Sequence, residues 1–361
     1  MKTIEKNISL YLCKFVKKVQ KMDLQARIET FVTLGNFLRD EENQSIIEEW
    51  ADRASHQNNW FTPQNTKNAI KSIADFYLDR DTLERWVGLY EIPDRPPIIK
   101  SIGVIMAGNI PAVGFHDLLT VVIAGHECVA KVSSQDSVLM LALIEKLLEI
   151  SPTLGIRISE RMNEVDALIA TGSDNSARYF EYYFRNKAHI IRQNRSSVAI
   201  LNGNETEDDF FALGKDITDY YGLGCRNISK FYVPEDYDFV NFYDTIEPLG
   251  DVFYHNKYKN NYDYNKSIYL VNQVHHYDNG FLILTKNESL VSPISVIFYE
   301  TYQNEEDLKQ KIAGKTDKIQ CIVSKDAWFD GSIPFGETQM PKLWDYADGV
   351  DTMLFLLSLN D

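Results

Sequence analysis

Residues 220–230, YYGLGCRNISK, place one cysteine directly after Gly-Leu-Gly. Gly222 and Gly224 allow the backbone to bend with positive φ and to approach another group closely. A thiol at such a bend can face a cleft, and its own backbone N–H can stabilise an oxyanion. A helix C-cap before a buried cysteine explains the same residues equally well. Cys225 is therefore a candidate nucleophile, and the structural interpretation stays open beside it.

Asn109 lies in the motif GNIP, in a predicted loop after the apolar run IKSIGVIMA. Its side-chain amide can donate two hydrogen bonds, and Pro111 stiffens the loop that carries it. These properties suit an oxyanion donor, whereas an Asx-turn is the better interpretation of the loop taken alone. The remaining cysteines, Cys13, Cys128 and Cys321, lie on an apolar helical face or in predicted strands, where a buried cysteine is a common core residue.

Three loops, AGNIPAVG, KVSSQD and ATGSD, each follow a predicted strand. Ligands of parallel sheets bind outside the carboxyl ends of the strands, so these loops are candidates for a nucleotide site. Lys131 ends its strand and either meets a ribose or phosphate or faces solvent. Gly172 and Ser173 open a helix, an arrangement suited to pyrophosphate, although an N-cap serine explains Ser173 as well. The dinucleotide motif GxGxxG is absent, so an ordinary Rossmann dehydrogenase has no support.

The elements that position these residues follow from the hydrophobic periodicity. Helical spacing runs through the first 90 residues or so, up to the proline-rich segment EIPDRPPIIK. Strands and helices then alternate, which predicts an α/β fold with a mostly parallel sheet. A second, smaller α/β unit follows, in which residues 251–290 show no clean period.

Composition narrows the class of protein. The chain has 361 residues, 44% of them hydrophobic, and a net charge of −15, which argues against nucleic acid as a partner. No apolar run is long enough to span a bilayer, and the lysines in the N-terminal stretch are unlike a signal peptide, so we expect a cytoplasmic protein. The four cysteines include no CxxC pair, so neither a metal site nor a disulfide framework is expected.

Six motifs occur in the order seen in the aldehyde dehydrogenase superfamily: GNIP, GHECVAKVSSQD, ATGS, GLGCRNISKFYV, VSPISVIFYE and PFGET. Within that superfamily, DYYGLGCRNISK and MAGNIPAVGFHDLL resemble the LuxC-type fatty acyl-CoA reductases. The resemblance covers roughly residues 95–340. It implies two α/β units, a Rossmann-like cofactor domain and a smaller catalytic domain. The domains it implies are a helical region that packs on the cofactor domain (1–95), the cofactor domain (96–203), the catalytic domain with the nucleophile (204–338) and a C-terminal segment (339–361).

The resemblance also implies roles for single residues. Cys225 matches the nucleophile and Asn109 the oxyanion-hole asparagine. Lys131 matches the lysine that holds the adenosine ribose. The other implied cofactor-binding residues are Ser133 and Ser134 after that lysine, Gly172 and Ser173 near the pyrophosphate, and Pro293 beside the nicotinamide half.

Two departures from the superfamily pattern bear on function. Ser134 stands where relatives commonly carry an acidic residue, which removes repulsion against a 2′-phosphate and favours NADPH, with NADH left open. Residues 191–194, IRQN, contain no carboxylate where hydrolytic relatives carry a glutamate base.

The sequence therefore predicts an acyl-CoA reductase that converts an acyl thioester, of long chain by resemblance, into an aldehyde. The substrate is acyl-CoA or an acyl-protein, and the resemblance is compatible with an acyl-transferring partner enzyme and with a homo-oligomer. Two alternatives stay open. One is a superfamily reductase of a short aldehyde or acyl phosphate, and the other is an acyl-holding subunit that depends on a partner.

Overall fold

The computed structural model describes residues 22–172 and 174–359, so the candidates Cys13 and Ser173 lie outside the described residues. The chain divides into two compact units. Unit 1 comprises Met1–Gln193 and Lys342–Asp361, and unit 2 comprises Asn194–Pro341.

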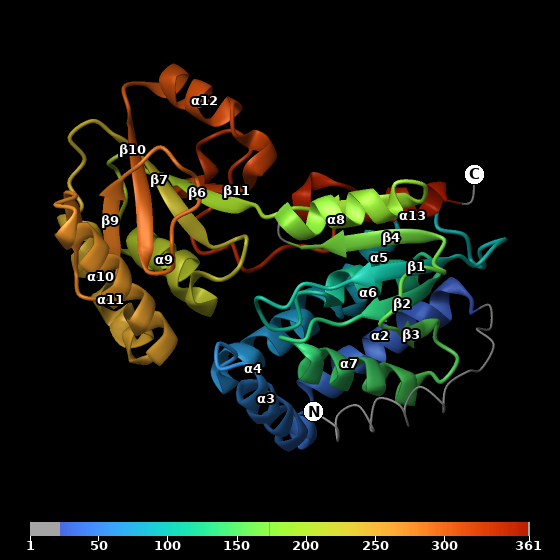
Figure 1. Ribbon diagram of the computed structural model, residues 1–361. Coiled ribbons are helices and arrows are strands. Elements are labelled where there is room, and N and C mark those ends of the chain that lie inside the picture. The colour runs from blue at the N-terminus through green and yellow to red at the C-terminus, as the bar shows by residue number, and fades with distance from the viewer. Residues whose placement is uncertain (1–21, 173, 360–361) are drawn as a thin grey trace. The chain divides into compact units, whose positions relative to one another are not determined.

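Unit 1 is built on a five-stranded parallel sheet of order β3-β2-β1-β4-β5 (Figure 1). The strand order reverses between β1 and β4, and ligands of such sheets bind at that reversal, outside the carboxyl ends of the strands. The strands are β1 (Ser101–Ile105), β2 (Glu127–Lys131), β3 (Ile156–Ile158), β4 (Ala167–Thr171) and β5 (Ala188–Arg192).

Helices cover both faces of this sheet. One face packs against α6 and α7, in a core that also takes in the N-terminal helices and α13, and the other packs against α8 (Figure 1). The helices of unit 1 are α2 (Leu24–Arg39), α3 (Gln44–Gln57), α4 (Pro63–Ser72), α5 (Arg80–Val87), α6 (Phe115–Ile123), α7 (Ser137–Ile150), α8 (Asp174–Phe184) and α13 (Thr352–Ser358). The helices α2 to α5 are therefore part of the same hydrophobic core as the sheet.

Unit 2 contains a six-stranded sheet of order β11-β6-β7-β10-β9-β8, parallel except for the β8–β9 pair. Helix α12 covers one face, whereas α9, α10 and α11 lie on the other (Figure 1). The strands are β6 (Ser196–Ile200), β7 (Ile228–Pro234), β8 (His276–Asp278), β9 (Ile283–Lys286), β10 (Val296–Tyr302) and β11 (Ile319–Ser324). The helices are α9 (Glu207–Thr218), α10 (Val240–Ile246), α11 (Asn256–Val271) and α12 (Glu305–Ala313).

The predicted α/β alternation is confirmed in both units, and residues 251–290 form regular structure although their sequence shows no clean period. They contain α11, whose sequence NKYKNNYDYNKSIYLV buries Tyr258, Tyr262 and Asn265. The buried stripe of this helix consists of tyrosine and asparagine rather than aliphatic residues, so it leaves no hydrophobic period in the sequence.

Candidate active site

The cysteine of unit 2 follows an abrupt reversal of the chain. Helix α9 begins with a capping box between Thr206 and Asp209, and a short 3-10 turn, Asp219–Gly222, follows its end. Within that turn Tyr220, Tyr221 and Gly222 have φ values of 51°, 59° and 74°. Left-handed backbone costs about 1–2 kcal/mol at each residue that carries a Cβ, so the two tyrosines must be held there by their surroundings.

Asn227 supplies much of that restraint. Its side-chain amide donates to the carbonyl oxygens of Asp216 and Asp219 at 2.9 and 2.8 Å. Its side-chain oxygen accepts the N–H of Gly224 at 2.8 Å, and the residue is only 3% exposed. One buried amide therefore ties the end of α9 and the left-handed turn to the segment that carries the cysteine.

Asp216, on the last turn of α9, connects the helix to the motif PFGET. One carboxylate oxygen accepts the N–H of Gly336 at 2.7 Å, and the other accepts the N–H and the hydroxyl of Thr338 at 3.2 and 2.7 Å. Gly336 has a φ of 84°, and a Cβ on it would lie 3.1 Å from the Cβ of Ala212, so glycine suits this close approach to the helix.

Cys225 lies between these two supports and is exposed. Its carbonyl oxygen accepts the hydroxyl of Ser197 at 3.0 Å, and the same hydroxyl lies 3.0 Å from the sulfur of Cys321. Arg226 donates from Nε to the carbonyl oxygen of Thr338 at 2.5 Å, so the residue that follows the cysteine is anchored on the PFGET loop. An exposed cysteine is accessible to a substrate or a reagent, which a reactive cysteine requires.

The other described cysteines lie in strands, as the sequence predicts. Cys128 is fully buried in β2, and burial raises the pKa of its thiol far above the ordinary value, which leaves it inert. Cys321 is half-buried in β11.

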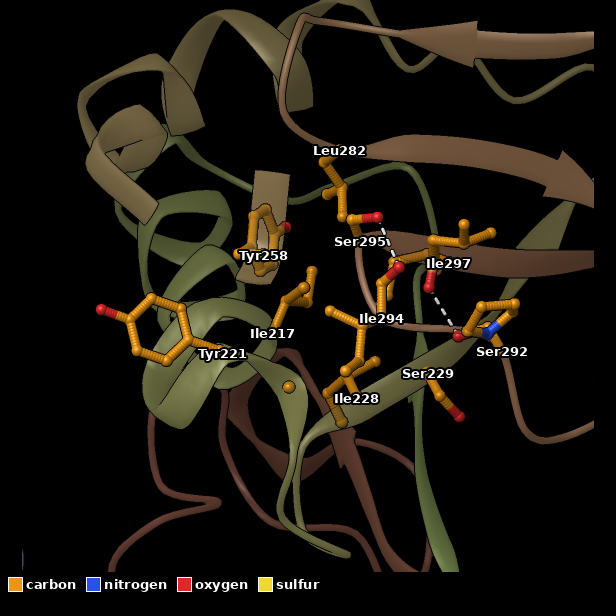
Figure 2. A pocket seen from close by; sticks show the side chains of 13 residues that line it. Ile217, Tyr221, Ile228, Ser229, Tyr258, Leu282, Ser292, Ile294, Ser295 and Ile297 are labelled. Atoms are coloured by element: carbon orange, nitrogen blue, oxygen red, sulfur yellow. Dashed lines mark hydrogen bonds between the residues drawn. The ribbon is translucent and has the colours of Figure 1, made fainter. Parts of the chain in front are cut away.

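Pro293 belongs to the loop before β10 and lines a small pocket beside the cysteine turn. Figure 2 shows the side chains of Ile217, Ile228 and Ile294 gathered at the centre of this pocket. Its volume is about 30 Å³, room for about one water molecule, so as it stands it does not hold an acyl chain. The lining residues are Ile217, Tyr221, Gly222, Ile228, Ser229, Tyr258, Leu282 and residues 292–297.

In unit 1 the Asn109 loop packs on the loop that follows β2. The N–H of Ala112, at a φ of 56°, donates to the carboxylate of Asp136 at 2.8 Å. A Cβ on Gly108 would lie 2.4 Å from the hydroxyl oxygen of Ser133, so this approach requires glycine. The structure thus brings the candidates Asn109 and Ser133 onto neighbouring loops.

Asp136 is 1% exposed, and its second carboxylate oxygen has no hydrogen-bond partner among the described residues. Desolvation raises the pKa of this carboxyl well above its ordinary value, against the single hydrogen bond from Ala112 that lowers it. The group therefore retains its proton under conditions in which an exposed aspartate is ionised.

Lys131 ends β2 with 40% of its side chain exposed, and its ammonium donates to the carbonyl oxygen of Glu160 at 3.3 Å and lies 3.9 Å from the Glu160 carboxylate. Ser134 is exposed, and its carbonyl oxygen accepts the side-chain amide of Gln57 at 2.8 Å. The Gln57 side-chain oxygen in turn accepts the N–H of Val138 at 3.0 Å. Helix α3 of the N-terminal region therefore holds the loop predicted to bind the ribose.

Gly172 directly follows β4, and its N–H donates to the carbonyl of Arg192 at 3.2 Å. A Cβ on Gly172 would lie 2.8 Å from the Cβ of Ser176, so this turn also favours glycine. The candidate loops after β1, β2 and β4 thus lie along the carboxyl edge of the sheet, on both sides of the reversal of strand order. A partly exposed lysine and two glycine turns that a Cβ would fill fit a dinucleotide there.

The structure places Asn109, Lys131, Ser133, Ser134 and Gly172 in unit 1, and it places Cys225 and Pro293 in unit 2. Across residues 22–172 and 174–359, no group of three His, Cys, Asp or Glu side chains is arranged to hold a metal ion. In the same part of the chain, no helix is long and apolar enough to cross a membrane.

Three residues that the sequence did not single out contribute to the site: Asp216, Asn227 and Gln57. The sequence around Asp216 does indicate a special role. This residue is a lone carboxylate on the face of α9 that also buries Leu213 and Ile217, and a charge on an apolar face needs dedicated partners.

Solved structures identify the fold. Aldehyde dehydrogenase 21 from Physcomitrella patens superposes with a TM-score of 0.67 at 12% identity, over 93% of this chain and 84% of that chain. An aldehyde dehydrogenase from Mycobacterium tuberculosis complexed with NAD+ gives 0.59 at 12% identity, over 84% and 73%. An NADP-dependent enzyme from E. coli gives 0.60 at 14% identity, over 86% and 79%. The chain has the aldehyde dehydrogenase fold, as predicted.

One curated relative refines the resemblance. The chain is 24% identical over 215 residues to long-chain acyl-protein thioester reductase 2 from Photobacterium leiognathi. The match covers 54% of this chain and spans 43% of that relative, less than half of its length. No protein-family model matches the sequence. The expected resemblance to LuxC-type reductases is confirmed by this relative, and the solved structures confirm the aldehyde dehydrogenase fold.

Proposed function

We propose that this protein reduces an acyl thioester to an aldehyde through an acyl-enzyme on Cys225. The observation that carries the proposal is the exposed thiol on a bend that Asn227 and Asp216 hold in place. The match to an acyl-protein thioester reductase supports the choice of a thioester as substrate.

The chemistry begins with attack of the Cys225 thiolate on the thioester carbonyl. The carbonyl oxygen gains negative charge, for which the side-chain amide of Asn109 and the backbone N–H of Cys225 serve as donors. Loss of one such donor typically costs about 100-fold or more in rate. The thiolate of CoA, or of an acyl-carrying protein, leaves, and the acyl group remains on the sulfur of Cys225.

Reduction of the acyl-enzyme requires no activated water. Residues 191–194 offer no carboxylate base, and Arg192 among them is buried against Asp117 at 2.6 Å. A base beside the thioester would promote its hydrolysis and lose the acyl group as acid. The residue composition of this segment therefore suits a reductase better than an aldehyde oxidase.

The cofactor we propose is NADPH, whose adenosine and pyrophosphate groups are held by unit 1. Lys131, Ser133 and Ser134 would hold the adenosine ribose and its 2′-phosphate, and Gly172 with Ser173 the pyrophosphate. Pro293 would lie beside the nicotinamide half. The reduced nicotinamide supplies hydride to the acyl carbon when bound. Ser134 carries no charge to repel a 2′-phosphate and Lys131 attracts one, which favours NADPH over NADH.

The substrate is acyl-CoA or an acyl-protein, with a long acyl chain by analogy to the relative's name. We further propose a cytoplasmic location, an acyl-transferring partner enzyme and self-association as features of the same function.

Turnover tests the proposal directly. The protein is incubated with NADPH and a chain-length series of acyl-CoA and acyl-carrier thioesters, while absorbance at the nicotinamide band and trapped aldehyde are followed. The Cys225→Ala variant should lose turnover, and the matched variant Cys321→Ala should retain it. Turnover by Cys225→Ala would refute the nucleophile. Stable acylation of Cys225 without cofactor oxidation would favour the acyl-holding subunit instead.

A further inference from the structure

We propose that Asp216 is a positioning residue for the Cys225 nucleophile, acting through Thr338 on Arg226 and through Asn227 on the turn before the thiol. This inference rests on the proposed role of Cys225 and assigns that site a residue that does not itself touch the substrate.

The carboxylate of Asp216 is the common point of attachment for two segments far apart in the sequence. It is 2% exposed and accepts three hydrogen bonds from Gly336 and Thr338, which follow it by 120 and 122 residues. Its own carbonyl oxygen accepts the amide of Asn227, which also binds the N–H of Gly224. One residue thus fixes both the PFGET loop and the loop that ends in the cysteine.

The link from the PFGET loop to the thiol runs through Arg226. Thr338 is fully buried, and its carbonyl oxygen accepts Nε of Arg226 at 2.5 Å. Because Arg226 directly follows Cys225, the place where its guanidinium is held determines how much of its charge the sulfur experiences. A nearby cation favours the thiolate, which is the nucleophilic form. Release of Thr338 would let the guanidinium move and reduce that effect.

Folding stability alone does not explain why a carboxylate occupies position 216. Desolvation raises the pKa of Asp216 to about 6, with Asp219 adding to the rise and the three donors opposing it. Keeping the group ionised at neutral pH therefore costs folding stability. A neutral side chain at this position would avoid the cost, but it could not accept three donors at once.

The test compares Asp216→Asn with Asp208→Asn, an exposed aspartate on the same helix. The full chain is alkylated with iodoacetamide over a range of pH, and the rate at Cys225 is read by peptide mass spectrometry, which separates it from Cys128 and Cys321. We expect Asp216→Asn to slow alkylation of Cys225 at pH 7 by about tenfold, equivalent to a shift of the midpoint by one pH unit. Cys225 in Asp208→Asn should alkylate at the native rate across the pH range.

Turnover gives an independent readout. Asp216→Asn should lower kcat and leave KM for NADPH unchanged, because the residues proposed to hold the adenosine ribose, Lys131, Ser133 and Ser134, lie in unit 1. A folded Asp216→Asn protein in which Cys225 alkylates at the same rate as in Asp208→Asn would overturn the proposal. Should Asp216→Asn fail to fold, Arg226→Gln tests the proposal instead. If Cys225 alkylates at the native rate in that variant, the charge of Arg226 does not favour the thiolate and the proposal is contradicted. If the native protein shows no turnover but the alkylation difference holds, the proposed function fails and the positioning role stands.

Discussion

Replacement of Asn227 by alanine tests how the cysteine turn is held. The side chain makes three hydrogen bonds of 2.8–2.9 Å: its amide donates to the carbonyl oxygens of Asp216 and Asp219, and its oxygen accepts the N–H of Gly224. Each bond contributes about 1 kcal/mol, and truncation leaves three backbone groups without that partner in a site that is largely closed to water. We therefore expect Asn227→Ala to lower the free energy of unfolding by about 3 kcal/mol.

The same substitution should change the alkylation rate of Cys225. Tyr220 and Tyr221 in the adjoining turn have left-handed backbone, which relaxes once the restraint is removed. Denaturant unfolding measures the stability, and peptide-resolved alkylation measures the thiol. Asn241→Ala, an exposed asparagine on α10, is the matched control and should change stability by about 0.5 kcal/mol or less. If the free energy of unfolding of Asn227→Ala is within about 0.5 kcal/mol of the native value and its Cys225 alkylates at the native rate, other contacts hold the turn and the reasoning is refuted.

Three further predictions concern unit 1. The pKa of Asp136 is higher in the folded state than in the unfolded chain, so folding favours the protonated carboxyl. The free energy that this proton contributes to folding is present at low pH and is lost as pH rises toward the folded-state pKa. Asp136→Asn, which cannot ionise, should therefore gain stability relative to the native protein as pH rises above the ordinary aspartate pKa, and a stability difference that does not change with pH would contradict it. Ser134→Glu should weaken NADPH binding while sparing NADH, as measured by fluorescence titration; an unchanged ratio of the two affinities would remove Ser134 from the cofactor site. Asn109→Ala should lower kcat by about 100-fold and leave alkylation of Cys225 unaffected, whereas a normal kcat would rule out the oxyanion role.

The sequence was informative where local chemistry determines structure. Apolar periodicity and proline-rich breaks predicted the α/β alternation, and the glycines around Cys225 predicted a sharp bend. The bend itself differs in detail, since Tyr220 and Tyr221 share the left-handed backbone that the pattern assigned to glycine. No local rule places tyrosine there, because the conformation is imposed by contacts from outside the turn.

Long-range contacts explain most of what the sequence did not reveal. The partners of Asp216 lie more than 100 residues further along the chain, and two of its three bonds come from backbone N–H groups that any residue carries. Asn227 likewise binds backbone atoms, so its role depends on position rather than on a recognisable pairing of side chains. The clamp of Gln57 on the loop after β2 depends on packing of the N-terminal helices, which periodicity alone does not specify.

Mass spectrometry of the acylated protein tests the central claim most directly. The protein is mixed with a long-chain acyl-CoA in the absence of NADPH, digested, and searched for the acyl adduct. One acyl group per chain on the peptide containing Cys225, discharged as aldehyde when NADPH is added, is the predicted result. An adduct on Cys321 or another residue, or aldehyde formation by Cys225→Ala, would contradict it.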